Sequence, residues 1–118
     1  MNIEKLFRKS TQEDFSIEDF ELFSDHEGIE LPESFNTLSM SVARKFDNNE
    51  ISYEDGDHAM NKIWTIMLNY IMEKNINLIQ PCYSIYCAFD HGEYDHRDGS
   101  DPVEQYTRPA IREILQNA

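Results

Sequence analysis

The sequence contains little glycine, proline or cysteine: four, four and two residues in a chain of 118. No glycine-rich turn leads from a strand into a helix, which excludes the common phosphate-binding loops. The GxSxG motif of serine hydrolases and the HExxH motif of zinc proteases are also missing. No motif therefore indicates nucleotide binding, a serine nucleophile or zinc-dependent proteolysis, and we expect a protein that is not an enzyme.

Long hydrophobic runs are absent too. No stretch approaches the eighteen or so apolar residues of a membrane span, and the first ten residues, MNIEKLFRKS, lack the core of a signal peptide. Cys82 and Cys87 lie on different sides of one expected helix, so a disulfide between them is sterically disfavoured. No second cysteine pair or suitably spaced histidine offers a zinc site. Two buried, unpaired thiols suit a reducing compartment, so we expect a cytoplasmic protein without a cofactor.

Basic residues are scarce. Ten Lys and Arg face 23 Asp and Glu, giving a net charge of -13 and a pI near 4.5. Such a surface repels phosphate backbones and anionic lipids, so we expect no direct contact with nucleic acid or membrane. Mean hydropathy is low at -0.64, but seven Phe, six Tyr and one Trp are more aromatics than disordered chains carry. The chain should fold as one domain, residues 1–118.

The stretch 52–74 organises the rest of the chain. Its apolar residues recur every three or four positions, which is typical of one face of an α-helix. This face consists of Ala59, Met60, Ile63, Trp64, Met67, Tyr70 and Ile71. Ser52 and Asp55 have the spacing of a helix N-cap. The segment therefore predicts a central helix roughly 30 Å long. Because Ile66, Leu68 and Met72 are apolar as well, we expect little of its second half to face water.

Five further segments favour helices. They cover residues 2–9, about 17–24, 31 to about 46, 81–91, and 101 to the end of the chain. We expect Gly92 to end the fourth of these in a left-handed conformation, and Pro109 to kink or split the last one. The second and fourth segments could also be strands. The predicted fold class is all-α: a single-domain bundle of five or six helices around the central helix.

A loop rich in histidine and acids follows the fourth of these segments. His91, Glu93, Asp95, His96, Asp98 and Asp101 fall within eleven residues. A zinc, manganese or iron site is one hypothesis, since imidazole and carboxylate bind these metals. A calcium loop is excluded because its acidic positions do not align. We favour the plainer interpretation, a solvated acidic loop without metal. Similarly, Asp55, Asp57 and His58 are explained more simply by the dipole of the central helix than by acid–base catalysis.

The distribution of charge is the most informative feature. Between Ser10 and Ala43 there is no Lys or Arg, although nine acids fall there. A second acidic set, residues 90–104, contains only Arg97 as a base. A field of one sign is typical of proteins that capture a basic partner. The predicted partner-binding residues are Glu13, Asp14, Glu18, Asp19, Glu21, Asp25, Glu27, Glu93, Tyr94, Asp95, Asp98 and Asp101.

Aromatic residues interleave with these acids and could anchor such an interface. They are Phe15, Phe20, Phe23 and Tyr94. The alternative is that the phenylalanines belong to the core, and for Phe20 and Phe23 this alternative is at least as strong.

With its acidic N-terminal half, long central helix and C-terminal segment YSIYCAFDHGEYDHRDGSDPVEQYTRPAIREIL, the chain resembles small bacterial immunity proteins. These proteins are paired with polymorphic toxins, including those of contact-dependent growth inhibition. The resemblance covers size, acidity, the helical pattern and the character of the C-terminal third. Immunity proteins share no diagnostic motif across families, so no residue role is transferred.

The resemblance implies a cytoplasmic, non-enzymatic inhibitor that binds a cognate toxin domain one-to-one. The toxin would be a basic nuclease, such as a tRNase. Two other functions stay open at this point. One is a metal-dependent hydrolase that uses the His91–Asp101 loop, and the other is an adaptor that is acidic only for solubility.

Overall fold

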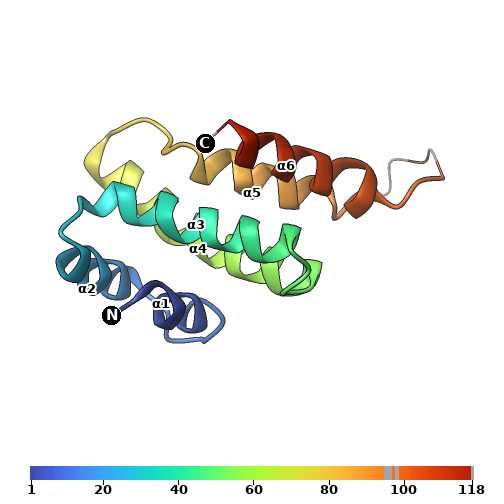
Figure 1. Cartoon of the computed structure of the whole chain (residues 1–118). Coiled ribbons are helices and arrows are strands. Elements are labelled where there is room, and N and C mark those ends of the chain that lie inside the picture. Colours follow the sequence, from blue (N-terminus) through green and yellow to red (C-terminus); the bar gives the residue numbers. More distant parts are fainter. Residues whose placement is uncertain (95–96, 98, 118) are drawn as a thin grey trace.

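A computed structural model describes residues 1–94, 97 and 99–117 of the chain (Figure 1). These residues form six α-helices and one π-helical turn, with no strand among them. The elements are α1 (Ile3–Lys9), α2 (Ile17–Glu27), α3 (Leu31–Asp47), α4 (Tyr53–Lys74), α5 (Cys82–His91), the π-turn η1 (Val103–Thr107) and α6 (Arg108–Gln116). The predicted all-α bundle is confirmed, and the two segments that could have been strands are helices.

The central helix has almost the predicted bounds. Ser52 caps it, its hydroxyl accepting a hydrogen bond from the Asp55 backbone N–H at 3.1 Å. It ends at Asn75, which is left-handed with φ 54°. One face of α4 is buried, and α3 and α5 pack against it (Figure 1). The expectation that its second half avoids water is wrong for Met72, whose surface is 71% exposed.

Helix α2 begins with a complete capping box. The Ser16 side chain caps the Asp19 backbone, while the Asp19 carboxylate accepts a hydrogen bond from the Ser16 backbone N–H at 3.0 Å. Phe20 and Phe23 follow on the buried side of the helix, and Phe15 just before it is buried as well. These three phenylalanines are therefore core residues. They cannot anchor a partner, which corrects that part of the sequence interpretation.

Gly92 ends α5, but not in the way expected. Its φ of -73° and ψ of -13° are right-handed, so it is not a left-handed stop. Glycine is needed there because a side chain would not fit. A Cβ atom at position 92 would lie 2.5 Å from Thr107 Oγ1 and 2.8 Å from Tyr53 Cε1. Glycine thus allows α4, α5 and η1 to approach one another closely. The two cysteines are free as predicted, although Cys87 is half-buried rather than buried.

Pro109 does not split the last helix, because Thr107 and Arg108 before it both keep right-handed helical angles and only the hydrogen-bonding pattern changes there. The turn before it is π-helical, and the Arg108 backbone N–H donates to the carbonyl of Val103, five residues earlier. Helix α6 follows this turn directly, with Pro109 as its second residue. The Arg108 guanidinium stacks 4.4 Å from the centre of the Phe46 ring and donates to the carbonyls of Phe46 and Asp47. Arg108 therefore fastens the C-terminal helix to the end of α3.

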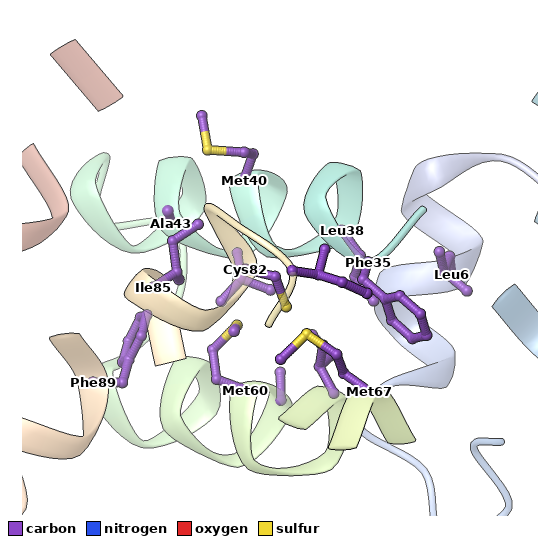
Figure 2. Packing of buried hydrophobic residues seen from close by; sticks show 14 of the residues in the cluster. Leu6, Phe35, Leu38, Met40, Ala43, Met60, Met67, Cys82, Ile85 and Phe89 are labelled. Carbon is purple, nitrogen blue, oxygen red and sulfur yellow. The ribbon is translucent and has the colours of Figure 1, made fainter. Parts of the chain in front are cut away.

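The core lies where side chains of α1, α3, α4 and α5 point toward one another (Figure 2). Fully buried side chains such as Leu6, Phe35, Met60, Ile85 and Phe89 come from four different helices. No buried side-chain nitrogen or oxygen of the described residues lacks a hydrogen-bond partner. Across the described part of the chain, no helix has both the length and the apolar character that crossing a bilayer requires.

Candidate functional site

The predicted acids of the N-terminal half surround α2. Glu13, Asp14, Glu18, Glu21, Asp25 and Glu27 are exposed, and we call these six residues the α2 acids. Only Asp14 among them has an ion-pair partner in the described chain, with Lys9 Nζ at 3.0 Å from its Oδ2. This hydrogen bond lowers the pKa of Asp14 and raises the pKa of Lys9. The other α2 acids project charge into solvent.

Asp19 differs from its neighbours. Its side chain is only 11% exposed, it caps the start of α2, and it lies 3.9 Å from Lys9 Nζ. A carboxylate so engaged holds the helix terminus in place and has little surface to offer a partner. We therefore assign Asp19 to the fold and leave it out of the binding surface.

The predicted C-terminal residues lie far from the α2 acids. Glu93, Tyr94 and Asp101 are exposed, while Asp95 and Asp98 lie outside the described residues. Figure 1 places α2 and the C-terminal end of α5 at opposite ends of the molecule, whose longest dimension is 45 Å. The structure thus divides those predicted residues that it describes into two separate surfaces.

A third acidic group joins the predicted Glu93 to two acids that were not among the predicted partner-binding residues. Asp57, in the second turn of α4, lies beside the end of α5, because the Tyr53 hydroxyl donates to the Phe89 carbonyl at 2.6 Å and a Cβ at Gly56 would touch the Phe89 ring. Glu93 and Asp90 act on the Asp57 carboxyl there, and we call these three residues the acid triad. The pKa of Asp57 rises from its ordinary 3.8 to about 7. Burial is the main cause, followed by a hydrogen bond with the Glu93 carboxyl and the negative charges of Glu93 and Asp90. Near neutral pH the triad therefore holds a proton that an isolated aspartate would have lost.

The acid triad has no cationic partner among the described residues. None of the ion pairs in that part of the chain involves its members. Two neutral donors reach it: Asn61 Nδ2 lies 3.4 Å from Asp57 Oδ2, and the Tyr94 hydroxyl lies 3.2 Å from Asp90 Oδ2. Asp57 hydrogen-bonds to the Glu93 carboxyl and is repelled by the charges of Glu93 and Asp90, so a positive group from outside would be favourable here.

Aromatic side chains continue the same surface. The Trp64 ring stacks on Tyr86, with 4.7 Å between ring centres and 14° between planes, and it also contacts Tyr83 at 5.3 Å. All three residues are half-buried. On α4, Trp64 belongs to a stripe at three- and four-residue spacing that starts at Asp57. The stripe consists of Asp57, Asn61, Trp64, Leu68 and Met72.

We call the combined surface the α4–α5 face. It comprises the stripe on α4 together with Tyr83, Tyr86 and Asp90 of α5 and the following residues Glu93 and Tyr94. The sequence carried a partial signal for it. Two helices joined by a short link pack antiparallel, which brings the start of α4 to the end of α5. Which carboxylates then come together depends on how α4 and α5 are rotated about their axes. The spacing of residues in the sequence did not reveal this rotation.

The hypothesis of a metal site finds no support in the described residues, where no three His, Cys, Asp or Glu side chains converge in a way that could hold an ion. His91 is exposed at the end of α5. Asp95, His96 and Asp98 lie outside the described residues, so the solvated-loop interpretation stays a prediction.

A groove of about 720 Å³ lies on another side of the molecule, between α3, the start of α5 and α6. Its charged residues are Glu33, Arg44 and Glu113, and its lining contains no histidine or cysteine. None of the predicted partner-binding residues lines it. The groove therefore offers no histidine or thiol for catalysis and shares no residue with either acidic surface.

Comparisons with known proteins add no relative: no family model matches the chain, and no match was found among curated proteins or solved structures.

Proposed function

We propose that this protein is an immunity protein that binds and neutralises a cognate basic toxin domain. The observation that carries the proposal is the large excess of exposed, unpaired acid. Among the described residues, seven of the nine acids between Ser10 and Ala43 have no ion-pair partner, and neither has the acid triad. Like charges held together oppose folding, so retaining them is best explained by a positive partner.

A nuclease such as a tRNase is the toxin class that fits best. Its active site uses Lys and Arg to hold phosphate groups, and an acidic surface can occupy the same groove and exclude the substrate. The negative field would also accelerate encounter, toward about 10⁸–10⁹ M⁻¹s⁻¹ at low salt. The inhibitor would act stoichiometrically, one-to-one, without catalysis. We place it in the cytoplasm, where its two free thiols would stay reduced.

Co-expression tests the proposal directly. If the upstream open reading frame encodes a large secreted protein with a basic C-terminal domain, that domain should arrest growth when produced alone. Growth should recover when this protein is produced with it, and the two should co-purify as a stable one-to-one complex. Arrest without rescue, or turnover of a substrate by the purified protein alone, would contradict the proposal.

An adaptor that is acidic only for solubility makes a different prediction. Its partner binding should not change when the α2 acids are replaced by their amides. An inhibitor steered by charge should instead associate more slowly and depend less on salt after the same change.

A further inference from the structure

The α4–α5 face combines three chemical characters in one line. At one end lies the acid triad, in the middle the stacked Trp64 and Tyr86, and at the other end Leu68 and Met72. At about 1.5 Å per residue, the stripe from Asp57 to Met72 runs for about 22 Å. The face is long enough for several turns of a helix or a short extended segment.

Its apolar end is unusually exposed. Met72 is 71% exposed, and the link after α4 adds Ile76 at 43% and Leu78 at 44%. Single exposed apolar residues are common on protein surfaces, so the informative one is Met72, which lies on the same stripe of α4 as Trp64 and Leu68. Tyr94, 52% exposed, adds another large ring beside the acidic end.

Its acidic end fits arginine better than lysine. A guanidinium is planar, donates two hydrogen bonds to a carboxylate at once, and stacks on aromatic rings. The acid triad supplies the carboxylates, and two tyrosine rings lie close to them. Burial and then the charge of Asp90 raise the pKa of Tyr86, and a hydrogen bond to Asp90 raises the pKa of Tyr94. An ammonium group would gain the charge attraction but lose the stacking and the paired hydrogen bonds.

We propose that the α4–α5 face is the docking site for an amphipathic, arginine-bearing segment of the toxin domain. The arginine sits on the acid triad beside Tyr86, and the apolar residues of the segment cover Trp64, Leu68 and Met72. This inference rests on the proposed function. It assigns different tasks to the two acidic surfaces, because the α2 acids only guide the approach while the α4–α5 face holds the partner.

A pair of matched substitutions tests the apolar end. Met72→Lys and Leu22→Lys each replace an exposed apolar residue, 71% and 58% exposed, on a different helix. Neither should disturb the core. Met72→Lys should weaken toxin binding at least tenfold, since it puts a buried charge against a basic partner. Leu22→Lys should weaken it threefold or less, through the general loss of negative charge.

A second pair tests the acidic end. Asp57→Asn with Glu93→Gln removes two acids from the face, and Glu18→Gln with Glu21→Gln removes two from α2. Calorimetry should give at least a tenfold loss of toxin affinity for the first pair and threefold or less for the second. Equal losses in the two pairs would overturn the inference, because they would mean that only net charge matters. The rescue of growth by the unaltered protein would still stand, so the two proposals can fail separately.

A peptide probe makes the inference testable without the toxin. The chain has one tryptophan, and it lies in the middle of the face, so its fluorescence reports on occupancy. A short synthetic peptide with arginine at one end and leucine at the other should change the Trp64 emission in a saturable way. The same peptide with lysine in place of arginine should bind several-fold more weakly. The inference is overturned if the emission does not change, or if the peptide binds the variant with both Asp57→Asn and Glu93→Gln as tightly as it binds the unaltered protein.

Discussion

The α2 acids and the acid triad differ in how their charges come together. The α2 acids lie close together because they are close in the sequence. They are exposed to solvent around one helix, and their only ion-pair partner in the described chain is Lys9. The acid triad is formed by packing, which brings Asp57 at the start of α4 to Asp90 at the end of α5 and to Glu93 just after it, and Asp57 has its pKa raised to about 7. A run of acids in a sequence indicates a long-range field. A local binding site requires charges that tertiary contacts concentrate beside apolar surface.

The largest expected effect comes from the glycine next to the triad. A Cβ at Gly56 would lie 2.6 Å from Phe89 Cε1, so Gly56→Ala should force α4 and α5 apart and move Asp57 away from Glu93. We expect the free energy of unfolding to fall by about 2–3 kcal/mol. Urea denaturation of the purified variant measures this loss.

Gly28→Ala at the end of α2 is the matched control. Nothing lies within 4 Å of the added methyl, and only the left-handed φ of 67° is strained. Its cost should be about 1 kcal/mol. If the two alanine variants lose equal stability, the contact between position 56 and the Phe89 ring is not the cause of the loss in Gly56→Ala.

The next effect depends on pH. The pKa of Asp57 is about 7 in the folded protein and near 3.8 when unfolded, so the native state keeps a proton that the unfolded chain releases. Stability therefore falls as the pH rises from about 4 to about 7, and the penalty is complete above that range. Asp57→Asn removes it. After allowing for solvent screening, we expect a gain of about 1 kcal/mol near pH 8 and a smaller gain near pH 5.

Thermal melts at both pH values measure this difference. Glu21→Gln, which removes an exposed α2 acid, should change stability by less than about 0.5 kcal/mol at either pH. A gain for Asp57→Asn that is the same at both pH values would show that repulsion within the acid triad is not its source.

The smallest effect concerns rates. Glu18→Gln with Glu21→Gln should slow association with the toxin domain by about twofold to threefold at low salt and leave dissociation unchanged. Asp57→Asn with Glu93→Gln should mainly accelerate dissociation. Stopped-flow mixing at two salt concentrations separates the two, since the steering effect should vanish at high salt. The comparison fails if the α2 pair accelerates dissociation instead.

Much of the fold could be predicted because its signals are local. The spacing of apolar residues predicted α4 almost to the residue, and the Ser52–Asp55 pair marked a helix start that the structure contains. Pro109 marked the place where the last helix changes from π-helical to α-helical hydrogen bonding, for an equally local reason, the missing backbone N–H.

The features that sequence reasoning missed depend on packing between helices. Glycine is required at position 92 because Tyr53 and Thr107 lie too close to allow a side chain. Both residues are distant in the sequence, so the residues around Gly92 do not reveal this contact. The sequence left open whether Phe15 belongs to the core or to the surface. In the structure its ring packs on Phe20, and Phe20 packs on Phe35 of α3, so Phe15 is a core residue. The pairing of Asp57 with Glu93 is of the same kind, because it follows from the rotation of α4 against α5.

The exposed apolar end of α4 has a consequence for the free protein. Met72, Ile76 and Leu78 would adhere to the same side chains of a second molecule if the two could approach. At a net charge of -13, mutual repulsion keeps the molecules apart in dilute buffer. Concentrated salt shortens the reach of that repulsion to a few ångströms. Stocks of this protein should therefore stay clear at low ionic strength and begin to self-associate as salt is added, the reverse of ordinary salting-in.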